Sequence, residues 1–188
     1  MAAPRVPIDV DPETGVWSSD GLPMLFVPRH FLINNHRAME QALGRETYAR
    51  HLHGAGHKSA YHWCRDAAAT HSMAGLDVFH HYLRRLSQRG WGQFSVLDID
   101  PDAGTGRVRL DNSAFASEYG PDAGRHVCYM FEGWFAGALA WVAPDRGAGI
   151  DVTAAEVTCA GAGADHCEFQ ISPLCLNGEK ATAVSKAI

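Results

Sequence analysis

The sequence lacks the features of several common functional classes. It has no cluster of basic residues, and its 16 lysines and arginines are outnumbered by 21 aspartates and glutamates, which gives a formal net charge of −5. No apolar run approaches the ~20 residues of a membrane-spanning helix, and the N-terminal region lacks the apolar stretch of a secretion signal. We therefore expect no nucleic-acid partner, no membrane span and a cytoplasmic location.

Motifs for cofactor binding and catalysis are also missing. There is no nucleophile elbow, no phosphate-binding loop and no third glycine of a dinucleotide site. The segment that begins at Asp98 resembles the start of a calcium loop, but Ala103 and Arg109 stand where such a loop needs glycine and glutamate. These absences direct attention to the hydrophobic pattern and the cysteines.

The composition is that of a globular domain, with 188 residues, 46% hydrophobic and 20% charged. We expect an extended arm at 1–28, a domain at 29–175 and a polar tail at 176–188. The arm contains five prolines together with aliphatic and aromatic residues that a disordered tail would lack. It is therefore predicted to pack on the domain or to form a dimer contact with a second subunit.

The hydrophobic periods predict an α+β fold. Apolar spacings of three and four residues predict helices at 29–44, 46–70, 76–88 and 127–142. Alternating residues predict two hairpins, with strands at 93–100, 107–111, 150–159 and 167–172. Gly133 and Gly137 would let the last helix lie close to the sheet or to another helix. We expect an antiparallel sheet of about four to five strands, packed by helices.

The five cysteines need an explanation, because thiols stay reduced in the cytoplasm. Cys159 and Cys167 lie at neighbouring ends of the last two predicted strands. Sulfurs bound to one tetrahedral Zn²⁺ at ~2.3 Å lie about 3.8 Å apart, which suits two thiols across a hairpin mouth. Glu156 precedes Cys159 by three residues and offers a carboxylate. This spacing suggests a metal site in the last hairpin.

A third thiol is needed, and Cys128, Cys175 and Cys64 are the candidates. We choose Cys128, which opens the predicted buried helix, because a helix N-terminus favours the thiolate. Glu156 and Cys159 are an odd number of residues apart, so the strand must end or bulge between them if both bind one ion. On spacing alone, buried free thiols with a solvated glutamate are an equally good interpretation.

The last hairpin carries a motif of acidic, cysteine and glycine residues, which reads Glu156-Val-Thr-Cys159, then Gly161 and Gly163, then His166-Cys167-x-Phe169. With Cys128 upstream, this pattern resembles the 4-vinyl reductase domain family, here in a stand-alone form. That family includes the sensor domains of phenol- and toluene-responsive activators and a bacteriochlorophyll-synthesis protein. The resemblance implies an α+β homodimer with a structural Zn²⁺ held by Cys128, Glu156, Cys159 and Cys167.

The resemblance also implies a ligand pocket between the sheet and the helices. Glu132 is the only charged residue in 127–142, and an unpaired buried carboxylate is costly. One hypothesis is that it forms a cage for a small cationic amine with Tyr129, Trp134 and Trp91. The alternative is that it meets an arginine such as Arg125 or emerges at the helix surface. The proline-rich arm also resembles small proteins linked to the breakdown of methylated glycines.

Two functional classes follow from these observations. The first is a non-catalytic small-molecule-binding module (a sensor, carrier or accessory protein) with structural zinc, which docks onto an oxidoreductase in one version of this hypothesis. The second is a metalloenzyme or reductase-associated protein that acts on a small aromatic, tetrapyrrole or amine. An enzyme needs an open coordination position, whereas four protein ligands would close the ion to chemistry.

Overall fold

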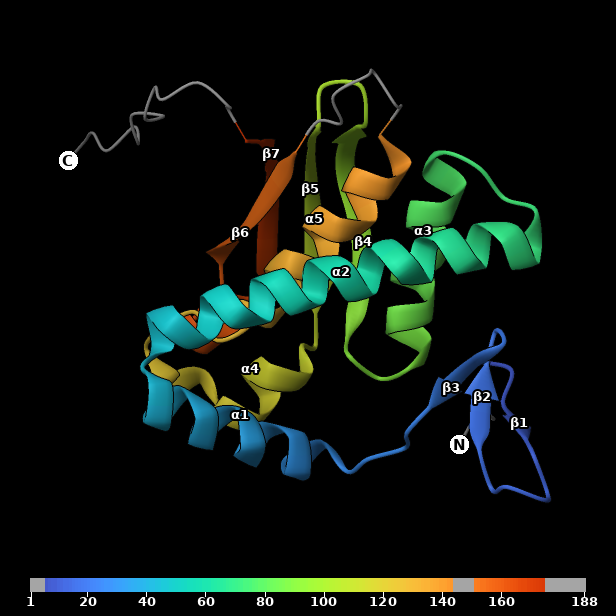
Figure 1. Ribbon diagram of the computed structural model, residues 1–188. Coiled ribbons are helices and arrows are strands. Elements are labelled where there is room, and N and C mark those ends of the chain that lie inside the picture. The colour runs from blue at the N-terminus through green and yellow to red at the C-terminus, as the bar shows by residue number, and fades with distance from the viewer. Residues whose placement is uncertain (1–5, 144–150, 175–188) are drawn as a thin grey trace.

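The computed structural model describes residues 6–143 and 151–174 (Figure 1). The expected tail at 176–188 lies outside the described residues. The helices are α1 (Arg29–Leu43), α2 (Arg45–His71), α3 (Leu76–Gln88), α4 (Ala114–Tyr119) and α5 (Met130–Val142), with short 3₁₀ turns η1 (Pro121–Ala123) and η2 (Ala160–Ala162). The strands are β1 (Asp9–Val10), β2 (Trp17–Ser19), β3 (Leu22–Met24), β4 (Gln93–Asp100), β5 (Thr105–Asp111), β6 (Val152–Thr158) and β7 (Cys167–Pro173).

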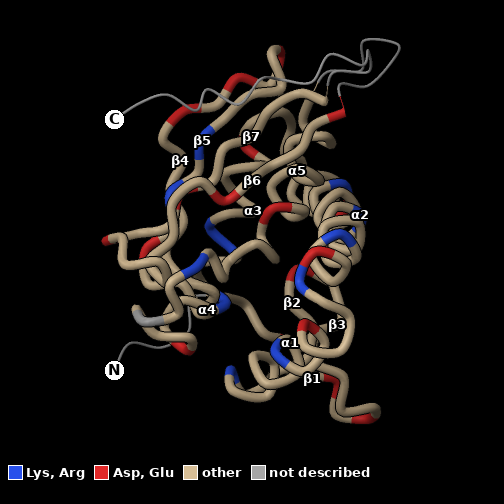
Figure 2. The backbone as a smooth tube through the Cα atoms, turned by 90° about the vertical axis from the view of Figure 1, so that its left-hand side faces the viewer, with Lys and Arg blue, Asp and Glu red and all other residues tan. Residues whose placement is uncertain are grey.

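The main sheet has four antiparallel strands in the order β4-β5-β7-β6. Its inner face is covered by α5 and α3, and α2 lies across α5 as an outer layer (Figures 1 and 2). The alternation along β5 and β7 explains this arrangement: Val108, Leu110, Phe169 and Ile171 point inward and are buried, while charged and polar residues occupy the other face. The predicted α+β class and the antiparallel sheet are confirmed.

Glycines bring α2 and α5 together. A Cβ added to Gly137 would lie 2.1 Å from the carbonyl oxygen of His57, and one added to Gly133 would lie 2.2 Å from that of His53. Gly56 in turn accommodates the Trp134 ring. The prediction that Gly133 and Gly137 permit a close contact is therefore confirmed, and the contacted element is another helix.

The arm is more ordered than the sequence indicated, since it forms a second antiparallel sheet, β1-β2-β3. The turn between β2 and β3 is made by Asp20 and Gly21, both with positive φ. Pro23 is tolerated because β3 is an edge strand. The proline content masked these strands, which are only two or three residues long.

Asp20 fixes this small sheet to the domain. Its side chain is 2% exposed and accepts a 2.7 Å hydrogen bond from Arg85, with Arg89 and His71 also within ion-pair distance. These partners come from α3, from the residue that ends it and from the end of α2. One buried carboxylate thus ties the arm to two helices.

Asp20, His71 and His81 each offer a ligand atom, and these atoms lie within 4.8 Å of one another, close enough to share a metal ion. The arginines around the three groups disfavour a cation, however. Arg85 already donates a hydrogen bond to the Asp20 carboxylate, and a guanidinium nitrogen of Arg84 lies 2.8 Å from Nδ1 of His81. We therefore assign the group a structural role.

Replacing Asp20 with asparagine is expected to release the arm, because asparagine keeps the left-handed turn but removes the negative charge. Amide hydrogen exchange in residues 17–24 should become markedly faster. The control is Asp11→Asn, since within the described residues the carboxylate of Asp11 hydrogen-bonds inside its own turn, to Glu13 and Thr14. Unchanged protection in the Asp20 variant would show that the arm is held by other contacts.

No helix within residues 6–143 and 151–174 combines the length and apolar character needed to cross a membrane.

Candidate metal centre

Four buried side chains converge at one end of the inner face of the sheet. The Sγ atom of Cys167 lies 3.6 Å from that of Cys128 and 4.0 Å from that of Cys159. A carboxylate oxygen of Glu156 completes a group in which all ligand atoms lie within 4.8 Å of one another. These are the four residues that the family resemblance indicated, and the group could hold a metal ion.

A β-bulge lets Glu156 and Cys159 face the same point. The pairing of β6 with β7 shifts register between Glu156 and Thr158, so Val157 and Thr158 both turn away from the inner face. The strand ends at Thr158, and Cys159 points inward again at the start of η2. The irregularity that the odd spacing required is therefore present.

Cys128 does not open the helix, contrary to our expectation. α5 begins at Met130, and Cys128 lies in the turn before it, where its carbonyl oxygen accepts a hydrogen bond from the amide of Phe131. Its own amide donates a 2.9 Å hydrogen bond to Oε2 of Glu156. This bond places the thiol and the carboxylate side by side.

Backbone amides and one hydroxyl surround the sulfurs. The amide of Val127 donates to Cys159 Sγ, and that of Ala160 donates to Cys167 Sγ, each at 3.4 Å. The Ser113 hydroxyl lies 3.0 Å from Cys128 Sγ. Such donors stabilise negative charge on sulfur, as thiolate ligands require.

Gly161 allows the η2 turn to approach this cluster. A Cβ at this position would lie 2.8 Å from a Val127 methyl group and 3.5 Å from Cys159 Sγ. A side chain here would push the turn away from the segment that carries Cys128. The glycine in the sequence motif therefore has a packing role next to the sulfurs.

The four buried groups of the cluster are close enough to shift one another's pKa values, upward for Cys128, Glu156 and Cys167 and downward for Cys159. Burial, together with a hydrogen bond to Cys159, raises the pKa of Glu156 to about 9. Hydrogen bonds from Cys128 and Cys167 lower the pKa of Cys159. The other Glu156 oxygen, Oε1, is buried and has no hydrogen-bond partner among the described residues. A divalent ion would balance the charge and occupy this oxygen, so the residues fit a metal.

Glu132 lies next to the cluster without belonging to it. Its carboxylate accepts a 2.9 Å hydrogen bond from the amide of Glu156, and burial raises its pKa. Arg125, the arginine that we considered as its partner, instead pairs with Glu40. Glu132 thus helps to hold the strand that presents Glu156.

The other predicted ligand residues occupy two places. Trp91 and Trp134 meet edge to face, with ring centroids 5.0 Å apart. Tyr129 instead packs on His36, and its hydroxyl donates to Glu40. Among the described residues, no hydrogen bond joins Glu132 to either tryptophan. The cage of these four residues stays a prediction.

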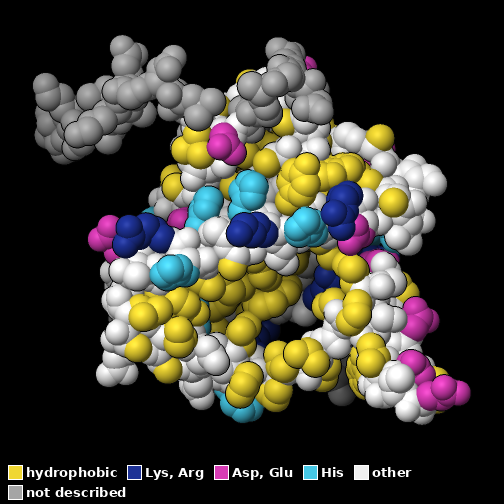
Figure 3. All heavy atoms as spheres, in the orientation of Figure 1, with side chains coloured by type: hydrophobic (Ala, Val, Ile, Leu, Met, Phe, Trp, Pro, Cys, Tyr) yellow, Lys and Arg dark blue, Asp and Glu magenta, His cyan; other side chains and the backbone are white. Residues whose placement is uncertain are grey.

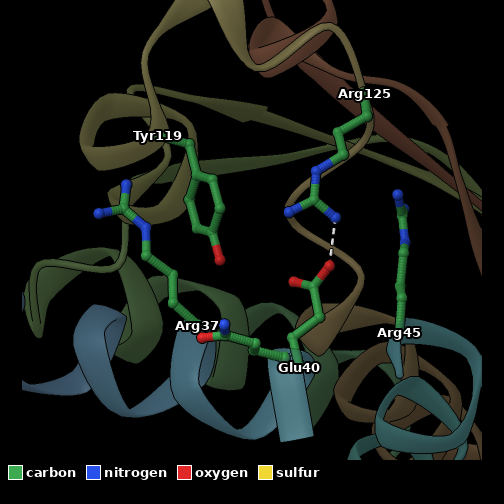
Figure 4. Close-up of a pocket in the computed structure, with 6 residues that line it drawn as sticks. Arg37, Glu40, Arg45, Tyr119 and Arg125 are labelled. Atoms are coloured by element: carbon green, nitrogen blue, oxygen red, sulfur yellow. Dashed lines mark hydrogen bonds and ion pairs between the residues drawn. The ribbon is translucent and has the colours of Figure 1, made fainter. Parts of the chain in front are cut away.

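Aromatic side chains fill the space between the sheet and α5. Phe131, Phe135, Phe94 and Phe169 form a connected group with ring centroids 4.9–6.2 Å apart. A cavity of about 340 Å³ is found elsewhere, between α1, the start of α2, the end of α4 and the segment that precedes Cys128 (Figure 4). Its arginines come from three separate segments with no shared motif, which is why sequence reasoning missed them.

The fold and the cysteine cluster define a domain of the 4-vinyl reductase type: residues 107–173 match the model of the 4-vinyl reductase domain, which confirms the family resemblance. Residues 2–97, half of the chain, match a family described as a domain of unknown function, DUF5943. The chain therefore belongs to the DUF5943 family and carries a 4-vinyl reductase domain in its C-terminal part. A search of curated proteins gave no significant match.

Solved structures show the same fold at low sequence identity. The phenol-responsive sensory domain of the transcription activator PoxR, solved with phenol, is 18% identical, with a TM-score of 0.72 over 88% of this chain and 84% of its own. A trafficking protein particle complex subunit 3 from Naegleria fowleri, covalently bound to palmitic acid, is 12% identical, with a TM-score of 0.55 over 78% and 95%. A vinyl-4-reductase family protein from Methanocaldococcus jannaschii is 12% identical, with a TM-score of 0.51 over 81% and 85%.

Proposed function

We propose that this protein is a non-catalytic small-molecule-binding domain, a sensor or carrier, whose C-terminal half is held together by a structural Zn²⁺. The observation that carries this proposal is the buried group of three sulfurs and one carboxylate. Four protein donors fill a tetrahedral shell and leave no position for a reacting water. When bound, the ion supplies cross-linking between Cys128, before α5, and the β6–β7 hairpin.

Zinc is the metal that this donor set favours. Soft thiolates select zinc over calcium and magnesium, and the 3.6–4.0 Å sulfur separations suit sulfurs bound to one small ion. The amides of Val127 and Ala160 offset the excess negative charge of three thiolates and a carboxylate.

Similar folds support the binding role. The PoxR domain was solved with phenol, and the Naegleria subunit carries palmitic acid. Both are small organic molecules held by this architecture. We extend that role to this chain as part of the proposal.

X-ray absorption at the zinc edge tests the proposal, together with mass spectrometry of small molecules released on denaturation. We expect three sulfurs and one carboxylate oxygen around the ion, and a co-purified organic molecule. Three sulfurs with an exchangeable water would instead favour the metalloenzyme. Protein without bound metal would contradict the structural role.

The amine cage of Glu132, Tyr129, Trp134 and Trp91 remains a prediction, as does a link to methylated glycines. Calorimetric titration with sarcosine, dimethylglycine and phenol tests both. Glu132→Gln should weaken binding of the two amines and leave phenol unaffected. Binding of phenol alone, or an unchanged affinity in the variant, would contradict the cage.

A homodimer formed through the arm is the further part of this proposal. Leu25 and Phe26, which link β3 to α1, are each 86% exposed, and Phe31 on α1 is also exposed. Hydrophobic side chains gather around the arm and α1 in the space-filling view (Figure 3). An apolar surface of this kind is typical of a contact with a second copy.

Replacing Phe26 with glutamate should therefore convert a dimer into a monomer, because a charge at the contact would have to be buried. Light scattering of the purified protein measures the change. The control is Leu97→Glu, which changes an exposed leucine on β4 far from the arm in sequence. A parent protein that is already monomeric would remove this part of the proposal.

A further inference from the structure

The cavity in Figure 4 has an unusual lining, which consists of Arg37, Glu40, Gln41, Arg45, Tyr119 and Arg125. α1 supplies the first three of these residues, and α2 begins at the fourth. Its volume of about 340 Å³ falls at the lower end of the range for small-molecule sites. It therefore has room for a molecule of metabolite size.

The lining carries three positive charges and one negative charge. Arg125 pairs with Glu40, whose second oxygen accepts from the Tyr129 hydroxyl, so this carboxylate is fully used. Arg37 donates to the backbone oxygen of Glu118 at 2.9 Å, and Arg45 donates to that of His126 at 2.7 Å; neither makes an ion pair within the described residues. Two guanidinium groups thus lack a carboxylate partner in the cavity.

Glu132 is a further carboxylate whose charge acts on Arg45, but it also holds the Glu156 amide. A neutral amide does not cancel the charge of Glu132, so three arginines face two carboxylates. One positive charge remains for a ligand to balance.

Tyr119 adds a hydrogen-bond donor. Its hydroxyl oxygen is buried and has no hydrogen-bond partner among the described residues. The guanidinium carbon of Arg37 lies 4.5 Å from the ring centroid, and that of Arg125 lies 5.6 Å from it, so both cations pack on the ring. Burial raises the pKa of Tyr119, which keeps the hydroxyl protonated. In Figure 4 this hydroxyl points into the space beside Glu40.

We propose that this cavity binds a small organic carboxylate through the Tyr119 hydroxyl and the Arg37 guanidinium, while Arg45 adds positive charge from beyond the Arg125–Glu40 pair (Figure 4). Guanidinium groups match the planar, two-oxygen geometry of a carboxylate. The oxygens of an ionised carboxylate only accept hydrogen bonds. They would accept from the Tyr119 hydroxyl and from guanidinium N–H groups. The inference rests on the proposed small-molecule-binding function and names the chemical class of its ligand.

Calorimetric titration of the full chain with malonate, benzoate and inorganic phosphate tests this assignment. We expect saturable binding of at least one carboxylate. Arg37→Gln should weaken it about tenfold or more, as expected for loss of one charged hydrogen bond. Arg50→Gln is the matched control, since Arg50 is an exposed arginine of α2 outside the lining.

Tyr119→Phe separates binding from folding. The hydroxyl has no partner within the described protein, so its removal should leave the unfolding midpoint unchanged while weakening carboxylate binding about tenfold. A variant that binds like the parent would overturn the proposal. So would tighter binding of phosphate than of either carboxylate, or no saturable binding of any of the three probes.

Failure of this inference can be told apart from failure of the proposed function. If denatured protein releases a neutral or cationic molecule whose binding is unchanged by Arg37→Gln, the binding function stands and the carboxylate assignment falls. If no molecule is released and no probe binds, both fall. Recovery of an acid whose binding Arg37→Gln weakens would support both.

Discussion

Replacing Cys167 with serine is expected to abolish metal binding and to leave a protein that is insoluble or unfolds at much lower urea concentration. The Cys167 sulfur lies 3.6 and 4.0 Å from the sulfurs of Cys128 and Cys159, and Cys167 begins β7, so its loss removes a link between the hairpin and Cys128. Structural zinc contributes on the order of 10 kcal/mol in small domains, which exceeds the total stability of many proteins. Urea unfolding and elemental analysis of the purified variant measure the effect.

Cys64→Ala provides the control for this experiment. Cys64 is also fully buried, but it lies in α2 outside the cluster. Its truncation should cost about 1–2 kcal/mol through a small cavity and leave the metal content unchanged. A Cys167→Ser protein that lacks metal and unfolds like the parent would show that the ion does not hold the fold.

Replacing Gly137 with alanine should have the second largest effect, a loss of about 3 kcal/mol or more in the free energy of unfolding. The new methyl group would lie 2.1 Å from the His57 carbonyl oxygen, and a backbone atom cannot rotate away as a side chain can. The whole α2–α5 contact would have to open. Urea unfolding with a two-state fit measures the loss.

Gly54→Ala is the matched control, because Gly54 lies in α2 beside the same contact but faces open space. Alanine there should raise stability by up to ~1 kcal/mol through helix propensity. Equal effects of the two substitutions would contradict the close approach of the helices.

The parts of the fold that follow from local pattern were predictable. α3 spans the predicted residues 76–88, and β4 spans the predicted 93–100. Both were predictable because the apolar spacing in the first segment fits a helix alone, and that in the second fits a strand alone. The start of α5 was not, since 127–129 are as apolar as the helix but form a turn held by the Cys128 and Tyr129 carbonyl oxygens. Composition cannot distinguish a buried turn from a buried helix.

The metal cluster could be predicted from the sequence, whereas the arginine cavity could not. The cysteine spacing in the last hairpin, taken together with the family resemblance, predicts one shared ion, and that requirement predicts an irregularity such as the bulge between Glu156 and Thr158. Arg37, Arg45 and Arg125 meet only because α1 packs beside α4 and the segment before α5. Such a meeting is a property of the tertiary fold and leaves no trace in local spacing.

The segment from Arg125 to Tyr129 belongs to both places, because it presents Cys128 to the sulfur cluster while Arg125 and Tyr129 both bind Glu40 at the cavity. Thermodynamic reciprocity sets the size of any coupling through this segment: the factor by which an acid in the cavity changes the affinity for an ion equals the factor by which the ion changes the affinity for the acid. The fraction of bound metal ion that a chelator removes at equilibrium, compared with and without a carboxylate in the cavity, would measure that factor.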